Sequence, residues 1–178
     1  MSVSSWQSEL QQAICIPRSN NHQPVVFVGV GRVENGDDGA GITIINRLMS
    51  VCKDSEKSLF INGGAAPENL LGVITRSQPR LVVFIDAAQM DREPGCVQVI
   101  PIEMIGGLTA VTHGLSFGII GRYLQDEVGC RVMVLGIQPQ SNQPNTTLSR
   151  VISDVVQQVS DSLEALVRDE ERGKYIFS

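Results

Sequence analysis

Two aspartates and one histidine stand where they could act together on a metal ion. Asp38 follows a glycine-rich loop, Asp86 ends a run of apolar residues, and His113 precedes a stretch of helical pattern. Two carboxylates and one imidazole form a ligand set that suits a first-row divalent ion and leaves about half of an octahedral coordination sphere vacant. These side chains would therefore serve catalysis, or share the ion with another molecule.

Each of these residues also has a purely structural interpretation. A carboxylate at position 37 or 38 could cap the helix that follows, because it accepts hydrogen bonds from the free N–H groups of a helix start. Asp86 could begin a turn, and His113 could cap a helix or lie in the core. We expect Asp37 to be the cap, so that its replacement costs little activity. We expect Asp38, Asp86 and His113 to be partly exposed.

The elements that must position these residues follow from the apolar pattern. Continuous apolar runs predict strands buried on both faces of a parallel sheet over residues 25–30 and 80–86. Further strands are predicted over residues 58–61, 96–101 and 131–137. Apolar residues at helical spacing predict helices over residues 4–15, 39–51, 67–73, 115–124 and 147–167. Strands that alternate with helices predict an α/β fold, a three-layer α/β/α sandwich with a mostly parallel central sheet. Ligands of such sheets bind beyond the carboxyl ends of the strands, where the three candidate residues would meet.

The chain has the size and composition of one compact domain. It has 178 residues, of which 42% are hydrophobic, enough to bury a core but too few for two comfortable domains. We divide it into a leader helix and linker (residues 1–24), the main domain (25–168) and a flexible tail (169–178). The second histidine, His22, falls in the linker and is a weaker ligand candidate.

Charge and cysteine usage exclude several partners. A net charge of −5 argues against nucleic acid and anionic membranes as binding partners. No run approaches the ~18 apolar residues that a membrane span requires. The four cysteines lie far apart without a CxxC pair, so the sequence encodes neither a zinc knuckle nor a compact disulfide framework. We therefore expect a cytoplasmic protein.

Two other kinds of chemistry are poorly supported. Gly29, Gly31 and Gly36 resemble a dinucleotide-binding loop, but their spacing is not GxGxxG and two acids stand where a pyrophosphate would lie. A nucleotide-binding flavodoxin-like module remains a minor alternative that calorimetry with nucleotides would test. No GxSxG elbow is present, and no cysteine stands at a strand end beside His113 in an obvious way. Oxidoreductase and serine hydrolase functions are therefore disfavoured.

Five sequence blocks in register resemble the hydrogenase maturation endopeptidases, which remove a C-terminal peptide from the nickel-containing large subunit. The blocks are Val28–Gly31 with Gly36–Gly41, Asn62–Gly64 with Ala66–Asn69, Ile85–Ala87, Thr112–His113 and Leu135–Pro139. They are most similar to the subgroup that serves the formate-hydrogenlyase type of hydrogenase. Together with their flanking elements they span roughly Val25 to Leu166, which is most of the chain.

The resemblance implies a phosphorylase/hydrolase-like fold and an endopeptidase acting on a hydrogenase large-subunit precursor. It places Asp38, Asp86 and His113 on the family's nickel-contacting positions, with the nickel supplied by the substrate, and we expect the enzyme to be a monomer. Another divalent cation could occupy the same ligands in a crystal. The alternative is a non-catalytic protein that binds metal or precursor on the same scaffold.

Two residues depart from the family pattern. Arg32 stands where the family commonly has Asn, and Asn62 stands where an Asp usually precedes the paired glycines. Neither is a metal-ligand position. The guanidinium of Arg32 could bind a carboxylate of the substrate, or it could disfavour a cation in the site.

Overall fold

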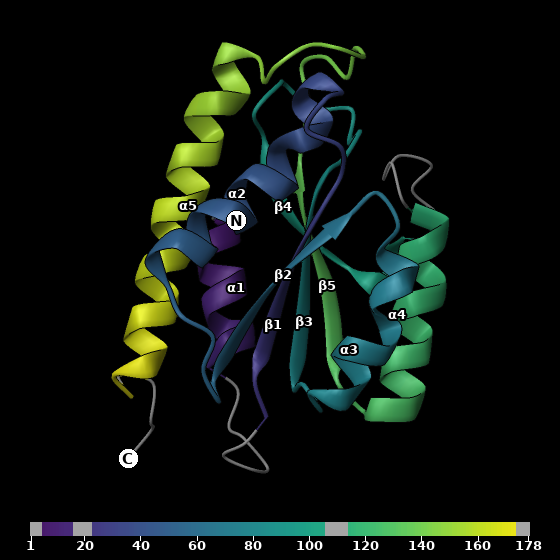
Figure 1. Ribbon diagram of the computed structural model, residues 1–178, viewed down its shortest axis with the longest axis vertical. Coiled ribbons are helices and arrows are strands. Elements are labelled where there is room, and N and C mark those ends of the chain that lie inside the picture. Colours follow the sequence, from purple (N-terminus) through teal and green to yellow (C-terminus); the bar gives the residue numbers. More distant parts are fainter. Residues whose placement is uncertain (1–4, 16–22, 106–113, 174–178) are drawn as a thin grey trace.

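Five strands form a single sheet at the centre of the molecule. The computed structural model describes residues 5–15, 23–105 and 114–173, and its strand order is β2-β1-β3-β5-β4. The strands are β1 (Val25–Val30), β2 (Ser58–Gly64), β3 (Leu81–Ala87), β4 (Val97–Pro101) and β5 (Arg131–Ile137). Only β4, at one edge, is antiparallel to its neighbour. The predicted three-layer sandwich with a mostly parallel sheet is confirmed (Figure 1).

Helices cover both faces of this sheet (Figure 1). The helices on one face are α1 (Trp6–Ile14), α2 (Ala40–Val51) and α5 (Arg150–Glu171), and those on the other are α3 (Leu71–Arg76) and α4 (Gly114–Val128). Three short 3-10 helices, η1 (Gly36–Gly39), η2 (Pro67–Leu70) and η3 (Ile102–Met104), lie between them in the chain. No helix of the described residues is both long and apolar enough to cross a membrane.

The apolar strand residues divide into two cores because successive side chains point to opposite faces. In β1, Phe27 lies in the core beneath α1, α2 and α5, while Val28 lies in the core beneath α3 and α4. Phe27 stacks on Phe60 at a ring-centroid distance of 5.6 Å, and Phe84 packs on Phe117 at 4.8 Å. Burial on both faces explains why the strands read as continuous apolar runs.

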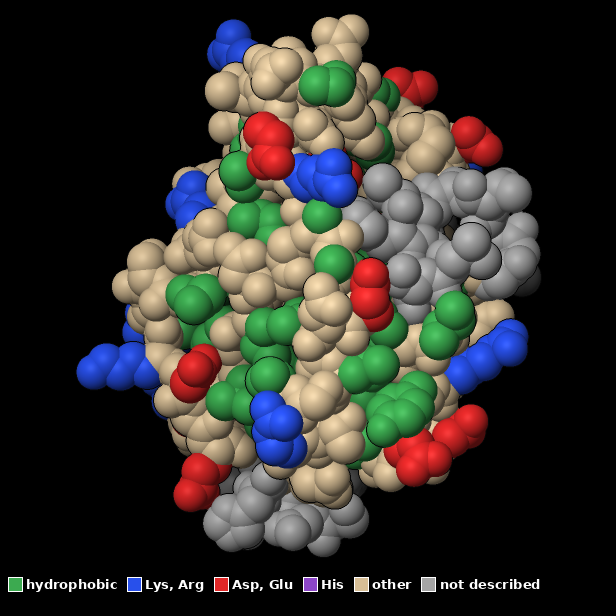
Figure 2. Space-filling model, turned by 45° about the vertical axis from the view of Figure 1, so that its right-hand side comes forward, with side chains coloured by type: hydrophobic (Ala, Val, Ile, Leu, Met, Phe, Trp, Pro, Cys, Tyr) green, Lys and Arg blue, Asp and Glu red, His purple; other side chains and the backbone are tan. Residues whose placement is uncertain are grey.

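The α3 and α4 face is less completely covered than the other. Helix α3 has six residues, and Leu59 and Ile61 of the neighbouring edge strand β2 remain partly exposed. Figure 2 shows apolar side chains gathered over this side of the molecule, with charged side chains around them.

The last helix differs from its prediction at both ends. It begins at Arg150 because the hydroxyl of Ser149 accepts a hydrogen bond from the N–H of Ile152 (3.4 Å), which caps the helix. It continues to Glu171, so the prediction of a flexible tail from residue 169 is wrong for residues 169–171. The remainder of that predicted tail, from residue 174, lies outside the described residues.

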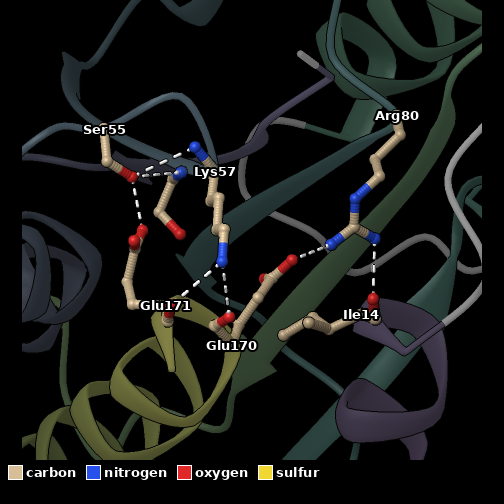
Figure 3. Close-up of polar contacts among 7 residues, drawn as sticks. Ile14, Ser55, Lys57, Arg80, Glu170 and Glu171 are labelled. Carbon is tan, nitrogen blue, oxygen red and sulfur yellow. Dashed lines mark hydrogen bonds and ion pairs between the residues drawn. The ribbon is translucent and has the colours of Figure 1, made fainter. Parts of the chain in front are cut away.

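A polar cluster at the amino edge of the sheet explains this longer helix (Figure 3). Arg80 forms a buried ion pair with Glu170 and donates a hydrogen bond to the carbonyl of Ile14 at the end of α1 (2.7 Å). The ammonium group of Lys57 donates to the carbonyls of Glu170 (3.1 Å) and Glu171 (3.0 Å), satisfying acceptors at the end of α5. These contacts hold the ends of α1 and α5 against the sheet.

Candidate active site

The start of α2 lies directly on the carboxyl ends of two central strands. A Cβ atom at Gly41 would lie 2.0 Å from the carbonyl oxygen of Ile85 in β3 and 2.7 Å from that of Val30 in β1. Only a glycine permits this approach, because real Cβ atoms do not come so close to backbone atoms. The preceding 3-10 helix η1, which carries Asp37 and Asp38, is thereby held at this edge and contacts β3.

The glycine-rich loop before η1 folds back onto Asp38. Gly31 has a φ of +129°, and a Cβ atom there would lie 1.8 Å from the carbonyl oxygen of Asp38. This geometry brings the backbone N–H of Arg32 within 2.9 Å of Oδ2 of Asp38, to which it donates a hydrogen bond. Helix α2 has no side-chain cap. Asp38 is therefore not a helix cap, and its carboxylate is oriented by the loop that precedes it.

The second carboxylate oxygen of Asp38 is the most informative atom of the site. Oδ1 is buried and has no hydrogen-bond partner among the described residues. A buried polar atom without a partner costs roughly 1–3 kcal/mol, so native proteins seldom retain one unless a ligand, an ion or water completes it. The arrangement fits a carboxylate with one oxygen fixed by the protein and the other reserved for a metal ion or a hydrogen-bond donor.

Asp37 has a different role from the one predicted. Its side chain is fully buried and accepts four hydrogen bonds, from the backbone N–H groups of Gln140 (2.9 Å), Ser141 (2.8 Å) and Ser149 (2.6 Å) and from the hydroxyl of Ser149 (3.0 Å). The prediction that Asp37 caps the following helix is wrong. Its carboxylate instead joins η1 to the segment that connects β5 with α5.

Asp86 lies inside strand β3, one residue before its end, where its backbone pairs with Gly136 of β5. The alternative that it begins a turn is therefore not what the structure shows. Asp86 is fully buried and only 5% of Asp38 is exposed, so the expectation that both would be partly exposed is wrong. Neighbouring strands and η1 bury these two side chains more completely than we expected for residues near a strand end.

The third predicted residue, His113, lies outside the described residues, as does His22. Helix α4 begins at the next position, Gly114, and its first turn lies at the same end of the sheet as the segment before α2 (Figure 1). Within residues 5–15, 23–105 and 114–173, no group of three His, Cys, Asp or Glu side chains could hold a metal ion. The structure thus brings Asp38 and Asp86 to one edge, and the contribution of His113 remains a prediction.

Gln138 was not among the predicted site residues, although it organises the chain after Asp86. It is buried, its Oε1 accepts hydrogen bonds from the N–H groups of Met90 (2.7 Å) and Arg92 (3.3 Å), and its Nε2 donates to Oε1 of Gln89 (3.1 Å). The sequence signal was present, because Gln138 directly follows a continuous apolar run, as Asp86 ends one.

Known proteins resemble this chain in sequence and in fold. The family model described as hydrogenase maturation protease matches residues 42–168, a range that includes Asp86 and His113. The hydrogenase 3 maturation protease of Escherichia coli K12 is 30% identical over 140 residues, which cover 78% of this chain and 88% of that protein.

Solved structures agree. The crystal structure of the [NiFe] hydrogenase maturation protease HycI from Thermococcus kodakarensis KOD1 superimposes with a TM-score of 0.79 at 27% identity, over 90% of this chain and 99% of that one. A crystal structure of a hydrogenase 3 maturation protease gives 0.72 at 28% identity, over 83% and 93% of the two chains. The matched family model spans more than half of the sequence, and this chain belongs to the hydrogenase maturation protease family.

Proposed function

We propose that this chain is an endopeptidase that removes the C-terminal extension of a nickel-loaded [NiFe]-hydrogenase large-subunit precursor. Its family and its resemblance to a hydrogenase 3 maturation protease support the reaction class and the kind of substrate. The observation that carries the proposal is the buried Oδ1 of Asp38, which has no hydrogen-bond partner within the described part of the chain, at the edge of the sheet where Asp86 also lies. It is the feature expected of a site completed by its substrate.

In this proposal, Asp38, Asp86 and His113 contact the nickel that the precursor already carries. Their two carboxylates and one imidazole fill part of a nickel coordination sphere, and thiolates of the substrate supply the rest. The metal would act as a Lewis acid toward the scissile carbonyl or toward a bound water. One of the two aspartates would then serve as general base.

Three of the four cysteines are poor candidates for a thiolate nucleophile. Burial raises the pKa of Cys130 to about 11, and burial is also the largest cause of the raised pKa values of Cys15 and Cys52. Such thiols remain protonated at neutral pH and are weak nucleophiles. We further propose that the protein works as a monomer in a reducing cytoplasm.

Arg32 occupies the rim of this site and allows a separate test. Its side chain is exposed and makes no hydrogen bond or ion pair with the described residues, while its backbone N–H binds Asp38. If the guanidinium binds a substrate carboxylate, Arg32→Ala raises the KM for the precursor. If the guanidinium disfavours the cation, the same change lowers the KM.

The alternative is a factor that binds the precursor without cutting it. Incubation with a nickel-loaded large-subunit precursor, followed by intact-mass measurement, separates the two functions. The proposal predicts loss of a C-terminal peptide with the wild-type protein and none with Asp38→Asn, which keeps the hydrogen bond from Arg32 but removes the charge. Binding of an unchanged precursor by the folded wild-type protein would establish the non-catalytic alternative.

A further inference from the structure

The outer edge of β2 presents backbone groups in a defined order. The N–H of Val25 donates to the carbonyl of Lys57 (2.8 Å), so residues 57, 59 and 61 direct their backbone groups toward β1. The alternate residues Ser58, Phe60 and Asn62 therefore direct theirs away from the sheet. Because β2 is an edge strand, these outward groups are available to another chain unless something covers them.

The first part of this edge is already closed by the preceding loop. The N–H of Ser55 donates to the carbonyl of Ser58 (2.9 Å), and the N–H of Ser58 donates to the hydroxyl of Ser55 (3.1 Å). The N–H of Phe60 donates to Oδ1 of Asp54 (3.0 Å). Side chains that occupy edge groups in this way prevent unwanted strand pairing.

The last part of the edge is open. Among the described residues, no partner occupies the outward N–H and C=O of Asn62. The Asn62 side chain is directed elsewhere, since its Nδ2 donates to Oδ1 of Asn46 (3.0 Å) and its Oδ1 accepts from the N–H of Gly64 (3.1 Å). A Cβ atom at Gly64 would meet nothing within 4 Å. An approaching peptide would therefore find both backbone groups and free space.

This open position lies two residues before a series of hydrogen bonds that reaches Asp38. The carbonyl of Gly64 accepts a hydrogen bond from the N–H of Gly31 (2.9 Å), and the next residue, Arg32, donates its N–H to Asp38. A chain that lies along β2 at Asn62 thus leads to the edge of the sheet where the candidate site lies.

Apolar side chains border the same strand. Leu59 and Ile61 pack against the core under α3 and α4 yet stay partly exposed. On those two helices Val73, Ile119 and Tyr123 are 45%, 70% and 44% exposed, and Figure 2 shows apolar side chains gathered on this side. An added strand would direct every second side chain toward this face.

We propose that the C-terminal extension of the precursor binds in extended form on the outer edge of β2, exchanging backbone hydrogen bonds with Asn62. This inference rests on the proposed function. Because the extension follows the scissile bond, it runs from the carboxyl edge toward the amino edge of the sheet, antiparallel to β2. The bonds of Asp54 and Ser55 end the pairing beyond Asn62. The site would therefore recognise only the first residues of the extension, preferring an apolar side chain toward α3.

A pair of variants at one position tests the backbone contact. Asn62→Pro removes the outward N–H at an edge position where proline is tolerated, whereas Asn62→Ala keeps the N–H and removes only the side-chain contacts. We expect the KM for the nickel-loaded precursor to be about tenfold higher for Asn62→Pro than for Asn62→Ala, with a smaller change in kcat. Equal KM values for two folded variants would overturn the inference.

Hydrogen exchange provides a second measurement that needs no substitution at Asn62. The amide of Asn62 should exchange more slowly with the full-length precursor than with a precursor that ends at the cleavage site. The amide of Phe60, already bound by Asp54, is the matched control and should not change. Experiments use Asp38→Asn to prevent cleavage during exchange, with wild type run briefly in parallel.

The possible results are distinguishable. Cleavage by the wild type without protection of Asn62 would overturn the docking inference and leave the proposed function intact. Failure of the wild type to cleave the loaded precursor would overturn the proposed function, and this inference with it. Protection of Asn62 that rises with protein concentration in the absence of precursor would show a second copy on this edge, and would also overturn the inference.

Discussion

The carboxylate of Asp37 accepts two hydrogen bonds from Ser149, one from its backbone N–H (2.6 Å) and one from its hydroxyl (3.0 Å). Ser149 is also the cap of α5. The residue next to Asp38 therefore anchors the start of the last helix, and it fixes the position of η1 at the same time. Of these adjacent aspartates, Asp37 stabilises the fold, whereas Oδ1 of Asp38 lies at the candidate site with no partner among the residues that the structure describes.

Replacement of Asp37 should destabilise the protein. Asp37→Ala leaves three backbone N–H groups and one hydroxyl without their buried acceptor, which we expect to lower the free energy of unfolding by about 3 kcal/mol. Cleavage should fall as well, contrary to what the sequence alone suggested, because η1 loses its anchor. Urea unfolding measures the effect, with Asp126→Ala on the exposed side of α4 as control. Equal midpoints for the two variants would contradict the assigned role.

Replacement of Asp38 should reduce cleavage and leave stability almost unchanged. Asp38→Asn keeps an acceptor for the N–H of Arg32 but removes the charge, so cleavage should fall at least about a hundredfold while the unfolding free energy changes by less than ~1 kcal/mol or increases. The same loss of cleavage is expected for Asp86→Asn and His113→Ala. Parallel activity and unfolding measurements test this. Wild-type cleavage by Asp38→Asn would remove this residue from the mechanism.

The ion pair between Arg80 and Glu170 should contribute more to the free energy of unfolding than the exposed pair between Glu164 and Arg168 of α5. Glu170→Gln removes the negative charge beside the largely buried guanidinium of Arg80, and we expect the free energy of unfolding to fall by about 2–4 kcal/mol. Glu164→Gln breaks the exposed pair with Arg168 and should cost less than about 0.5 kcal/mol. Thermal or urea unfolding of both variants makes the comparison. Similar losses would mean that burial does not strengthen the Arg80 contact.

The buried thiol of Cys130 should make stability depend on alkaline pH. Its pKa is raised from 9.0 to about 11, so between these values the unfolded chain releases a proton that the folded chain retains. Stability from this group is therefore fully present below pH 9 and is lost as pH rises toward 11. Cys130→Ala should flatten the decline of unfolding free energy over this window. If the unfolding free energy of Cys130→Ala declined as steeply with pH as that of the wild type, Cys130 would not be the cause of the decline.

Local pattern was sufficient to predict the sheet and the position of Asp86. The runs at residues 25–30 and 131–137 match β1 and β5, because strands buried on both faces need apolar side chains at every position. Asp86 stood out because a carboxylate ends such a run.

The features that the sequence pattern could not predict depend on contacts between residues far apart in the chain. The role of Asp37 depends on Ser149, and the length of α5 depends on the contact of Glu170 with Arg80, each pair far apart in the chain. No periodicity encodes these pairs. The burial of Asp38 likewise results from the close packing of α2 on two strands, which requires knowing where Gly41 lies in the fold.

In the proposed function, cleavage requires the metal that the substrate carries. Under this proposal, a partial ligand set on the protein, completed by thiolates of the substrate, would add binding energy only for the loaded precursor, and ~3 kcal/mol of differential binding gives more than a hundredfold discrimination. The direct measurement is one cleavage time course with nickel-loaded and nickel-free precursor at equal concentration, in buffer cleared of stray metal. We expect rapid cleavage of the loaded form and none of the free form. Equal cleavage of both forms would contradict it and leave a peptidase that reads sequence alone.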